Sequence, residues 1–302
     1  MGNSTVYDYT ILPDLWQLMD NVTENETEES GDWYENFVEP CQFTFCSNFV
    51  GTIPVFLGIT CLLGIVGNVA LGVALAKCPR FWDRCQPGKV ELALLAIGGL
   101  IFASTLPFFA LGIRWRWAFE DRVCQAIHGL KFGSLFAGGL LAAGTACRNP
   151  WGPPKQLLPA LLWTMGFVCA IPAALVSSSD GLCIPPRLAE LHAWSFVHAT
   201  SCLVILALLP VIVVSATACL AGCGERGRPR WNISWVFYLF WAPYGVAVFV
   251  EMFQKEIFFS QSCRFLDHLN SFLRLSEGWG MLHCYLSPFF ILGLGFYRRK
   301  TA

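Results

Sequence analysis

Charged side chains are scarce in this chain of 302 residues: Asp, Glu, Lys and Arg together make up 14%, whereas hydrophobic residues make up 55%. This balance lies far on the apolar side of the range for soluble domains. The formal net charge of −1 also conceals a segregation, because residues 1–40 contain neither Lys nor Arg. The composition therefore excludes an ordinary soluble globular protein and favours a membrane protein with an acidic N-terminal segment.

Catalytic and cofactor-binding motifs are missing as well. The 5 histidines are scattered, and the chain contains no GxSxG motif, no P-loop and no GxGxxG that opens a helix after a strand. No CxxC motif accompanies the cysteines, which argues against zinc. We therefore expect no enzyme, no metal site, no cofactor and no nucleic-acid partner.

Long apolar runs take the place of such motifs. A run of roughly 20 residues crosses the hydrocarbon core of a bilayer. Such runs occupy residues 50–76, 90–113, 123–147, 157–176, 194–222, 233–252 and 265–296. We predict an all-α membrane protein, a seven-transmembrane helix bundle over residues 50–296, with membrane lipids around it. A disordered acidic extracellular tail over residues 1–49 precedes it, and a short cytoplasmic tail, 297–302, follows.

Basic residues set the expected orientation. They gather in the first, third and fifth connections and in the last residues, at Lys77, Arg80, Arg84, Lys89, Arg148, Lys155, Arg226, Arg228, Arg230, Arg298, Arg299 and Lys300. The positive-inside rule makes this side cytoplasmic. Residues 1–30 have no apolar core of a signal peptide, so we expect the first span to direct insertion. The prediction is a multi-pass plasma-membrane protein with an extracellular N-terminus, present also in endosomes.

The N-terminal tail carries signals for modification and for binding. Acceptor sequences for N-glycosylation begin at Asn3, Asn21 and Asn25. Three tyrosines stand near acids, a setting in which secreted proteins are sulfated: Tyr7, Tyr9 and Tyr34. The tail is either a solvated glycosylated spacer or an anionic arm that attracts a basic protein ligand.

Five of the 14 cysteines fall on the predicted outer side: Cys41, Cys46, Cys124, Cys183 and Cys263. Oxidising surroundings favour disulfides there. Cys124 heads the third span and Cys183 follows the fourth, so this pair can join a loop to a helix. Cys41 or Cys46 can tie the tail to Cys263, and one cysteine is left over.

Charges inside the apolar runs are the best candidates for a pocket, because charge in a membrane is expensive and usually paired or functional. Lys131 lies about two helical turns below Cys124. Glu277 lies at a comparable depth in the last span, and Arg274 precedes it by about one turn. We predict a contact between Lys131 and Glu277. The alternative is that each charged side chain extends separately to the outer surface.

Several motifs within the spans resemble the chemokine-receptor branch of the rhodopsin-like receptors. They are Gly67-Asn68, Thr105-Leu106-Pro107-Phe108, Cys124, Trp163, Pro210, Phe240-Trp241-Ala242-Pro243-Tyr244, Glu277 and His283-Cys284. Further stretches are similar to the Duffy-type atypical chemokine receptors: Pro40-Cys41, Asp180-Gly181-Leu182-Cys183, Leu208-Leu209-Pro210 and Pro229-Arg230-Trp231-Asn232-Ile233. The resemblance covers nearly the whole chain.

The chain departs from signalling members of that branch where their switch residues stand. Arg148-Asn149-Pro150 replaces Asp-Arg-Tyr, and Pro150 disfavours helix there. Gly99 replaces the acid that binds sodium, Ala218 replaces a tyrosine, and Ser287-Pro288-Phe289-Phe290-Ile291 lacks the tyrosine of Asn-Pro-x-x-Tyr. Together these departures predict that the polar network of the active state does not form in its usual way.

The resemblance implies a receptor that binds chemokines, which are small basic proteins, without coupling to G proteins, and that serves as their sink, scavenger or transporter. Ligand-binding residues would be Tyr7, Tyr9, Tyr34, Lys131, Glu251 and Glu277. Three alternatives stay open. One is a signalling chemokine receptor, and another is a receptor for a different peptide or a lipid. A transporter or channel is the third, although no internal repeat supports it.

Overall fold

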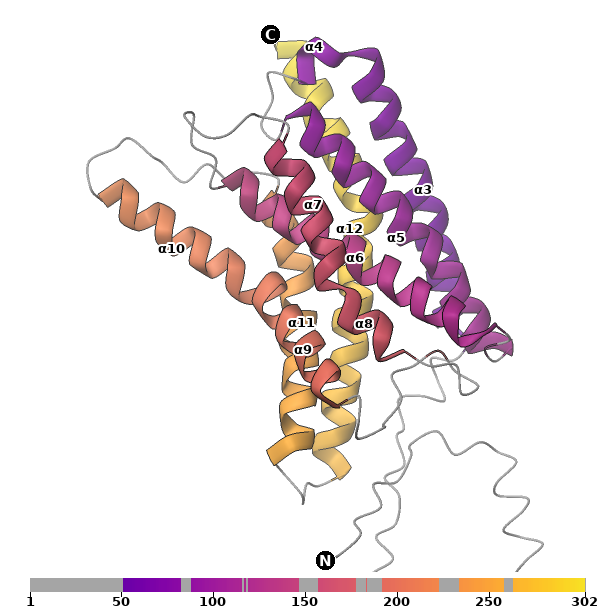
Figure 1. Cartoon of the computed structure of the whole chain (residues 1–302). Coiled ribbons are helices and arrows are strands. Elements are labelled where there is room, and N and C mark those ends of the chain that lie inside the picture. The colour runs from indigo at the N-terminus through magenta and orange to yellow at the C-terminus, as the bar shows by residue number, and fades with distance from the viewer. Residues whose placement is uncertain are drawn as a thin grey trace, which may run out of the picture. The chain divides into compact units, whose positions relative to one another are not determined.

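Helices make up nearly all of the chain that the computed structural model describes, which is residues 51–82, 88–115, 117, 119–146, 157–177, 183, 192–222, 234–257 and 263–301 (Figure 1). The helices are α3 (Ile53–Lys77), α4 (Pro79–Trp82), α5 (Lys89–Trp115), α6 (Asp121–Ala146), α7 (Leu157–Cys169), α8 (Ile171–Leu175), α9 (His192–Cys202), η2 (Leu203–Leu208), α10 (Leu209–Gly222), α11 (Ser234–Ile257) and α12 (Cys263–Thr301). The described residues provide 7 segments that are long and apolar enough to span a membrane. This confirms the predicted all-α bundle, with bounds a few residues from those expected.

Prolines divide two of the spans in ways that hydropathy did not reveal. α7 ends at Cys169 and α8 begins at Ile171. Pro172 explains the break, because proline has no N–H to donate and its ring clashes with the carbonyl four residues earlier. In the fifth span, η2 is π-helical, and the Leu209 N–H donates to the carbonyl of Val204. This wider turn directly precedes Pro210, which cannot continue the ordinary ladder.

α6 forms the buried centre of the bundle. Its apolar window is 72% buried, compared with 28–39% for the windows of the other spans. Glycines let neighbouring helices come close to it, because a Cβ at Gly133 would lie 2.4 Å from the ring of Phe167. The other spans turn large apolar side chains outward; Leu62, for example, is 67% exposed. Such faces suit contact with lipid chains.

Two polar side chains join helices across the bundle. Asn68 of α3 donates from Nδ2 to the carbonyl of Cys284 in α12 at 3.0 Å. Tyr238 of α11 donates from its hydroxyl to the carbonyl of Gly139 in α6 at 2.6 Å. Both bonds are buried, where they are stronger than in water. They fix α12 against α3 and α11 against α6.

Candidate functional site

The predicted ion pair forms inside the bundle. Lys131 of α6 donates from Nζ to Oε1 of Glu277 in α12 at 2.5 Å. The two side chains are only 6% and 17% exposed. The contact is therefore as predicted, and the alternative of two separately exposed charges is wrong.

Aromatic rings close the space around the ammonium group of Lys131. Its Nζ lies 4.7 Å from the ring centroid of Phe109 and 5.4 Å from that of Phe132. The faces of such rings attract a cation. Phe132 in turn stacks on Tyr244 at 6.5 Å between centroids. Lys131 is thus held by one carboxylate and two rings, and its charge is already neutralised within the protein.

Two further charged residues lie on the same helices as this site. Glu251 of α11 is half-buried, about two helical turns beyond Tyr244. Arg274 of α12 is exposed, about one turn before Glu277. Of the three pocket residues predicted from the sequence, the structure brings Lys131 and Glu277 into contact. Their role in ligand binding stays a prediction.

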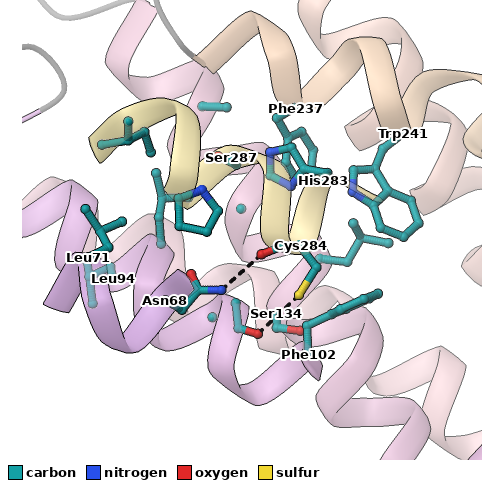
Figure 2. Close-up of a pocket in the computed structure, with 18 of the residues that line it drawn as sticks. Asn68, Leu71, Leu94, Phe102, Ser134, Phe237, Trp241, His283, Cys284 and Ser287 are labelled. Carbon is teal, nitrogen blue, oxygen red and sulfur yellow. Dashed lines mark hydrogen bonds between the residues drawn. The ribbon is translucent and has the colours of Figure 1, made fainter. Parts of the chain in front are cut away.

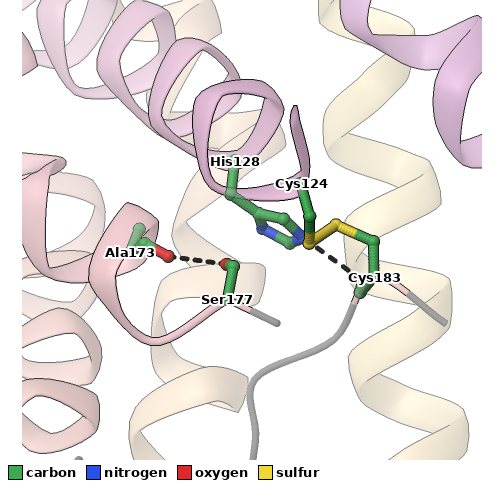
Figure 3. Close-up of a disulfide and its surroundings, with 5 residues drawn as sticks. All are labelled: Cys124, His128, Ala173, Ser177 and Cys183. Atoms are coloured by element: carbon green, nitrogen blue, oxygen red, sulfur yellow. Dashed lines mark hydrogen bonds between the residues drawn. A yellow bond between two sulfur atoms is a disulfide. The ribbon is translucent and has the colours of Figure 1, made fainter. Parts of the chain in front are cut away.

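A disulfide lies at the end of α6 nearest to this pair (Figure 3). Cys124 is bonded to Cys183 as predicted, with their Cα atoms 5.6 Å apart. Nε2 of His128 lies 3.3 Å from the carbonyl oxygen of Cys183, and its ring meets Phe109 edge-on at 5.2 Å. His128 therefore links the disulfide to the aromatic wall around the ion pair.

The sequence reasoning missed His128, although its spacing carried the signal. It stands about one helical turn after Cys124 and about one turn before Lys131, so all three share a face. The ligand atoms of Cys124, His128 and Cys183 lie within 4.8 Å of one another. A metal ion would need cysteine thiolates, but these sulfurs are bonded to each other. The group does not fit a metal ion while the disulfide is intact.

A cavity lies deeper among the helices, next to Trp241 (Figure 2). Its residues on α6 and α12 follow Lys131 and Glu277 in the chain. Its lining is mostly apolar with a few polar side chains, namely Asn68, Ser134, His283 and Ser287.

Gly99 also lines this cavity, at the position where the resemblance implied a sodium-binding acid. A Cβ on Gly99 would lie 2.5 Å from Oδ1 of Asn68, so the Asn68 amide fills the neighbouring space. Among the described residues of the lining there is no Asp or Glu. Hard cations in proteins are bound by oxygen ligands, mainly carboxylates and carbonyls. These residues therefore do not fit a sodium ion.

Several predicted site residues lie outside the part of the chain that the structure describes. They are Tyr7, Tyr9, Tyr34, Asn3, Asn21, Asn25, Cys41, Cys46 and the stretch Arg148-Asn149-Pro150. Cys263 is the first residue of α12, but both of its predicted partners are in the undescribed tail. The predicted tail disulfide, the glycans and the acidic arm accordingly stay predictions.

Comparison with known proteins places the chain in a family. No family model matches it. Atypical chemokine receptor 1 of Papio hamadryas is 30% identical over 241 residues, which cover 75% of this chain and 70% of that protein. The same receptor of Saimiri boliviensis boliviensis is 28% identical over 285 residues, 92% and 83% of the two chains. The human receptor is 27% identical over 294 residues, 95% and 85% of the two chains. The chain therefore belongs to the atypical chemokine receptor family.

Proposed function

We propose that this chain is a Duffy-type receptor that binds chemokines at the plasma membrane and does not activate G proteins. The observation that carries the proposal is the likeness to proteins named atypical chemokine receptor 1, which extends over 75–95% of the chain. The seven-helix bundle and the Cys124–Cys183 disulfide are consistent with it.

The acidic tail would make the first contact with a chemokine. In this proposal the tail is extracellular, carries glycans at Asn3, Asn21 and Asn25, and is tied to the bundle through Cys41 or Cys46 and Cys263. Chemokines are basic, so tail acids and the tyrosines Tyr7, Tyr9 and Tyr34 would attract them at long range. Such steering acts on association and is weakened by salt.

The ion pair limits what the bundle can add to this contact. A basic ligand group reaches Glu277 only by displacing Lys131, which is bonded to it and enclosed by two aromatic rings. Displacement would leave a buried lysine without a counter-charge, which is strongly unfavourable. We therefore propose that the ligand settles above the pair, toward Glu251, and that the tail supplies most of the affinity.

Shallow binding is consistent with the proposed lack of G-protein coupling. A ligand that leaves the Lys131–Glu277 contact intact has no direct means of separating α6 from α12. The switch residues of signalling receptors are also replaced at four places in this chain. The residues found there are Gly99, Ala218, Ser287-Pro288-Phe289-Phe290-Ile291 and Arg148-Asn149-Pro150. Ligand capture without activation would make the protein a sink, scavenger or transporter, at the cell surface and in endosomes.

An anionic lipid or peptide was the alternative ligand that Lys131 suggested. The contact with Glu277 argues against it, because the Lys131–Glu277 pair has no net charge and the ammonium group already has its counter-charge. A signalling chemokine receptor is the other alternative, and the assay below separates it from the proposal.

The test is binding of a labelled panel of basic chemokines to cells that express the full chain, with G-protein activation recorded in parallel. Replacing the tail acids by their amides should weaken binding by about tenfold or more at low and moderate salt, and flatten the salt dependence. The matched control is Lys131→Met with Glu277→Leu, corrected for surface amount, which should bind as the original chain does.

Two results would overturn the proposal. Unchanged affinity after neutralisation of the tail acids, at both salt concentrations, would exclude the acidic arm as the first contact. Ligand-dependent G-protein activation would establish the signalling alternative. A signalling receptor of the same branch serves as the positive control for activation.

A further inference from the structure

The cavity next to Trp241 is a feature that the proposed function leaves unused (Figure 2). Its volume is about 80 Å³, and one water molecule needs roughly 10–15 Å³ by the same kind of measure. The cavity therefore has room for several waters or for one compact organic molecule.

Missing side chains create part of this space. A Cβ added to Gly98 of α5 would have the Ser134 carbonyl oxygen and Trp163 Nε1 as its nearest atoms, both at 3.8 Å. That distance is ordinary van der Waals contact, so the wall can be thickened at Gly98 without displacing backbone. At Gly138 of α6 the corresponding Cβ would lie 3.0 Å from the ring of Phe237, which leaves no such room.

The lining excludes a charged occupant. Among the described residues that line the cavity, none is Asp, Glu, Lys or Arg, and most are apolar, such as Leu71, Leu135 and Ile291. An ion without a counter-charge is strongly disfavoured in apolar surroundings. An uncharged molecule with mostly apolar surface meets no such penalty.

One fully buried donor of the lining has no partner in the part of the chain that the structure describes. Asn68 Nδ2 donates to two backbone carbonyls and Ser134 Oγ to a third, so these donors are used within the protein. Nε1 of Trp163 is buried and, in the part of the chain that the structure describes, has no hydrogen-bond acceptor. An indole N–H donates only. The cavity therefore presents a donor that an occupant can satisfy.

We propose that this cavity is a binding site for a small, uncharged, mostly apolar molecule that presents a hydrogen-bond acceptor to Trp163 Nε1. A molecule of one aromatic or aliphatic ring with a carbonyl or ether oxygen has this chemistry, whether it arrives from the membrane or from solution. The site is separate from the chemokine contact proposed above, because it lies beyond the Lys131–Glu277 pair on both α6 and α12. Its test does not depend on chemokine binding.

The probe is 4-fluoroacetophenone, an uncharged ring with a carbonyl acceptor, followed by fluorine NMR with the full chain in lipid nanodiscs. Two related compounds serve as comparators: 1-ethyl-4-fluorobenzene has no acceptor, and 4-fluorobenzylammonium carries a positive charge. Empty nanodiscs measure partition into lipid, which competes with the site. The same titration at two lipid-to-protein ratios separates delivery through the membrane from delivery through water.

Two substitutions probe the site itself. Trp163→Phe keeps a ring in place and removes the donor, whereas Gly98→Leu fills the space. The expected result is saturable binding of the ketone that weakens by about tenfold in Trp163→Phe, the size of one hydrogen bond. The ethyl compound should bind the original chain about tenfold more weakly than the ketone does. It should bind the original chain and Trp163→Phe with equal affinity, because it has no acceptor for the donor that the variant lacks. Gly98→Leu should abolish binding, and the ammonium compound should not bind.

Three outcomes would overturn the inference. The first is that nanodiscs with the protein bind no more ketone than empty nanodiscs do. The cavity would then hold only water. The second is equal ketone affinity in the original chain and Trp163→Phe. The third is a higher thermal unfolding midpoint in Na⁺ than in choline at the same ionic strength, if Gly98→Leu removes this difference. That result would make the cavity a cation site. If Gly98→Leu does not fold, Trp163→Phe still decides the matter, and Gly98→Ala narrows the space with ordinary contacts only.

Discussion

Lys131 Nζ and Glu277 Oε1 lie 2.5 Å apart across the contact between α6 and α12, deep enough that neither side chain is more than 17% exposed. Either charge alone would be expensive at this depth in a membrane. Together, and with the rings of Phe109 and Phe132 around the ammonium, they form a neutral unit. The pair therefore fixes two helices while presenting little free charge to a ligand.

Removing one charge of this pair should be more damaging than removing both. Glu277→Gln leaves the buried ammonium of Lys131 without its counter-charge, which costs about 3–5 kcal/mol. We expect a large drop in the thermal unfolding midpoint of the purified receptor and less protein at the cell surface. The measurement is thermal unfolding in detergent, followed by tryptophan fluorescence.

The double variant Lys131→Met with Glu277→Leu is the control for that experiment. Apolar replacement of a whole buried pair is often neutral or stabilising, so its unfolding midpoint should return close to that of the original chain. A double variant as unstable as Glu277→Gln would mean that the contact, and not the unpaired charge, supplies the stability.

The sequence predicted this pair because both residues interrupt apolar runs at similar depth, and a charge inside a membrane needs a partner. It predicted the spans because hydropathy and length decide them. The break at Cys169–Ile171 was not expected, since Pro172 lies in an apolar run that reads as continuous. The cavity at Gly98 and Trp163 could not be predicted either. Its walls come from six spans, and no spacing along the chain shows that these small and aromatic residues face one another.

The Cys124–Cys183 disulfide should contribute about 2–5 kcal/mol, the usual loss when a native disulfide is removed. The double variant Cys124→Ser with Cys183→Ser is the appropriate change, because a single substitution leaves a reactive thiol. We expect reduced surface expression and a lower unfolding midpoint. His128 also loses the fixed carbonyl of Cys183 that its ring contacts at 3.3 Å, so the aromatic wall beside it should loosen. An unchanged midpoint would show that the helices hold this end of the bundle without the bond.

Gly166 marks a close approach between α6 and α7. A Cβ there would lie 2.3 Å from the backbone nitrogen of Ala137, and backbone cannot give way as a flexible side chain does. Gly166→Ala should therefore force the helices apart and lower the free energy of unfolding by about 1–3 kcal/mol or more.

Gly72→Ala in α3 is the matched control, because nothing lies within 4 Å of a Cβ at that position. In a helix interior this change should stabilise by about 0.5–1 kcal/mol, since alanine loses less backbone freedom on folding. The two variants should thus move the unfolding midpoint in opposite directions. Equal, small effects would contradict the close packing of α6 on α7.

The bond from the Tyr238 hydroxyl to the Gly139 carbonyl at 2.6 Å should hold α11 against α6. Tyr238→Phe keeps the ring and removes the donor, so the expected loss is about 0.5–1.5 kcal/mol, the net value of one hydrogen bond. Tyr244→Phe on the same helix is the control. Its ring contacts with Phe132 and Trp241 remain, and its hydroxyl has no hydrogen-bond partner among the described residues, so this change should leave the midpoint nearly unchanged.

Because the bond from Tyr238 to Gly139 joins two helices, hydrogen exchange should show faster amide exchange in α11 for Tyr238→Phe alone. Equal exchange in both variants would mean that apolar packing, and not this bond, sets the position of α11.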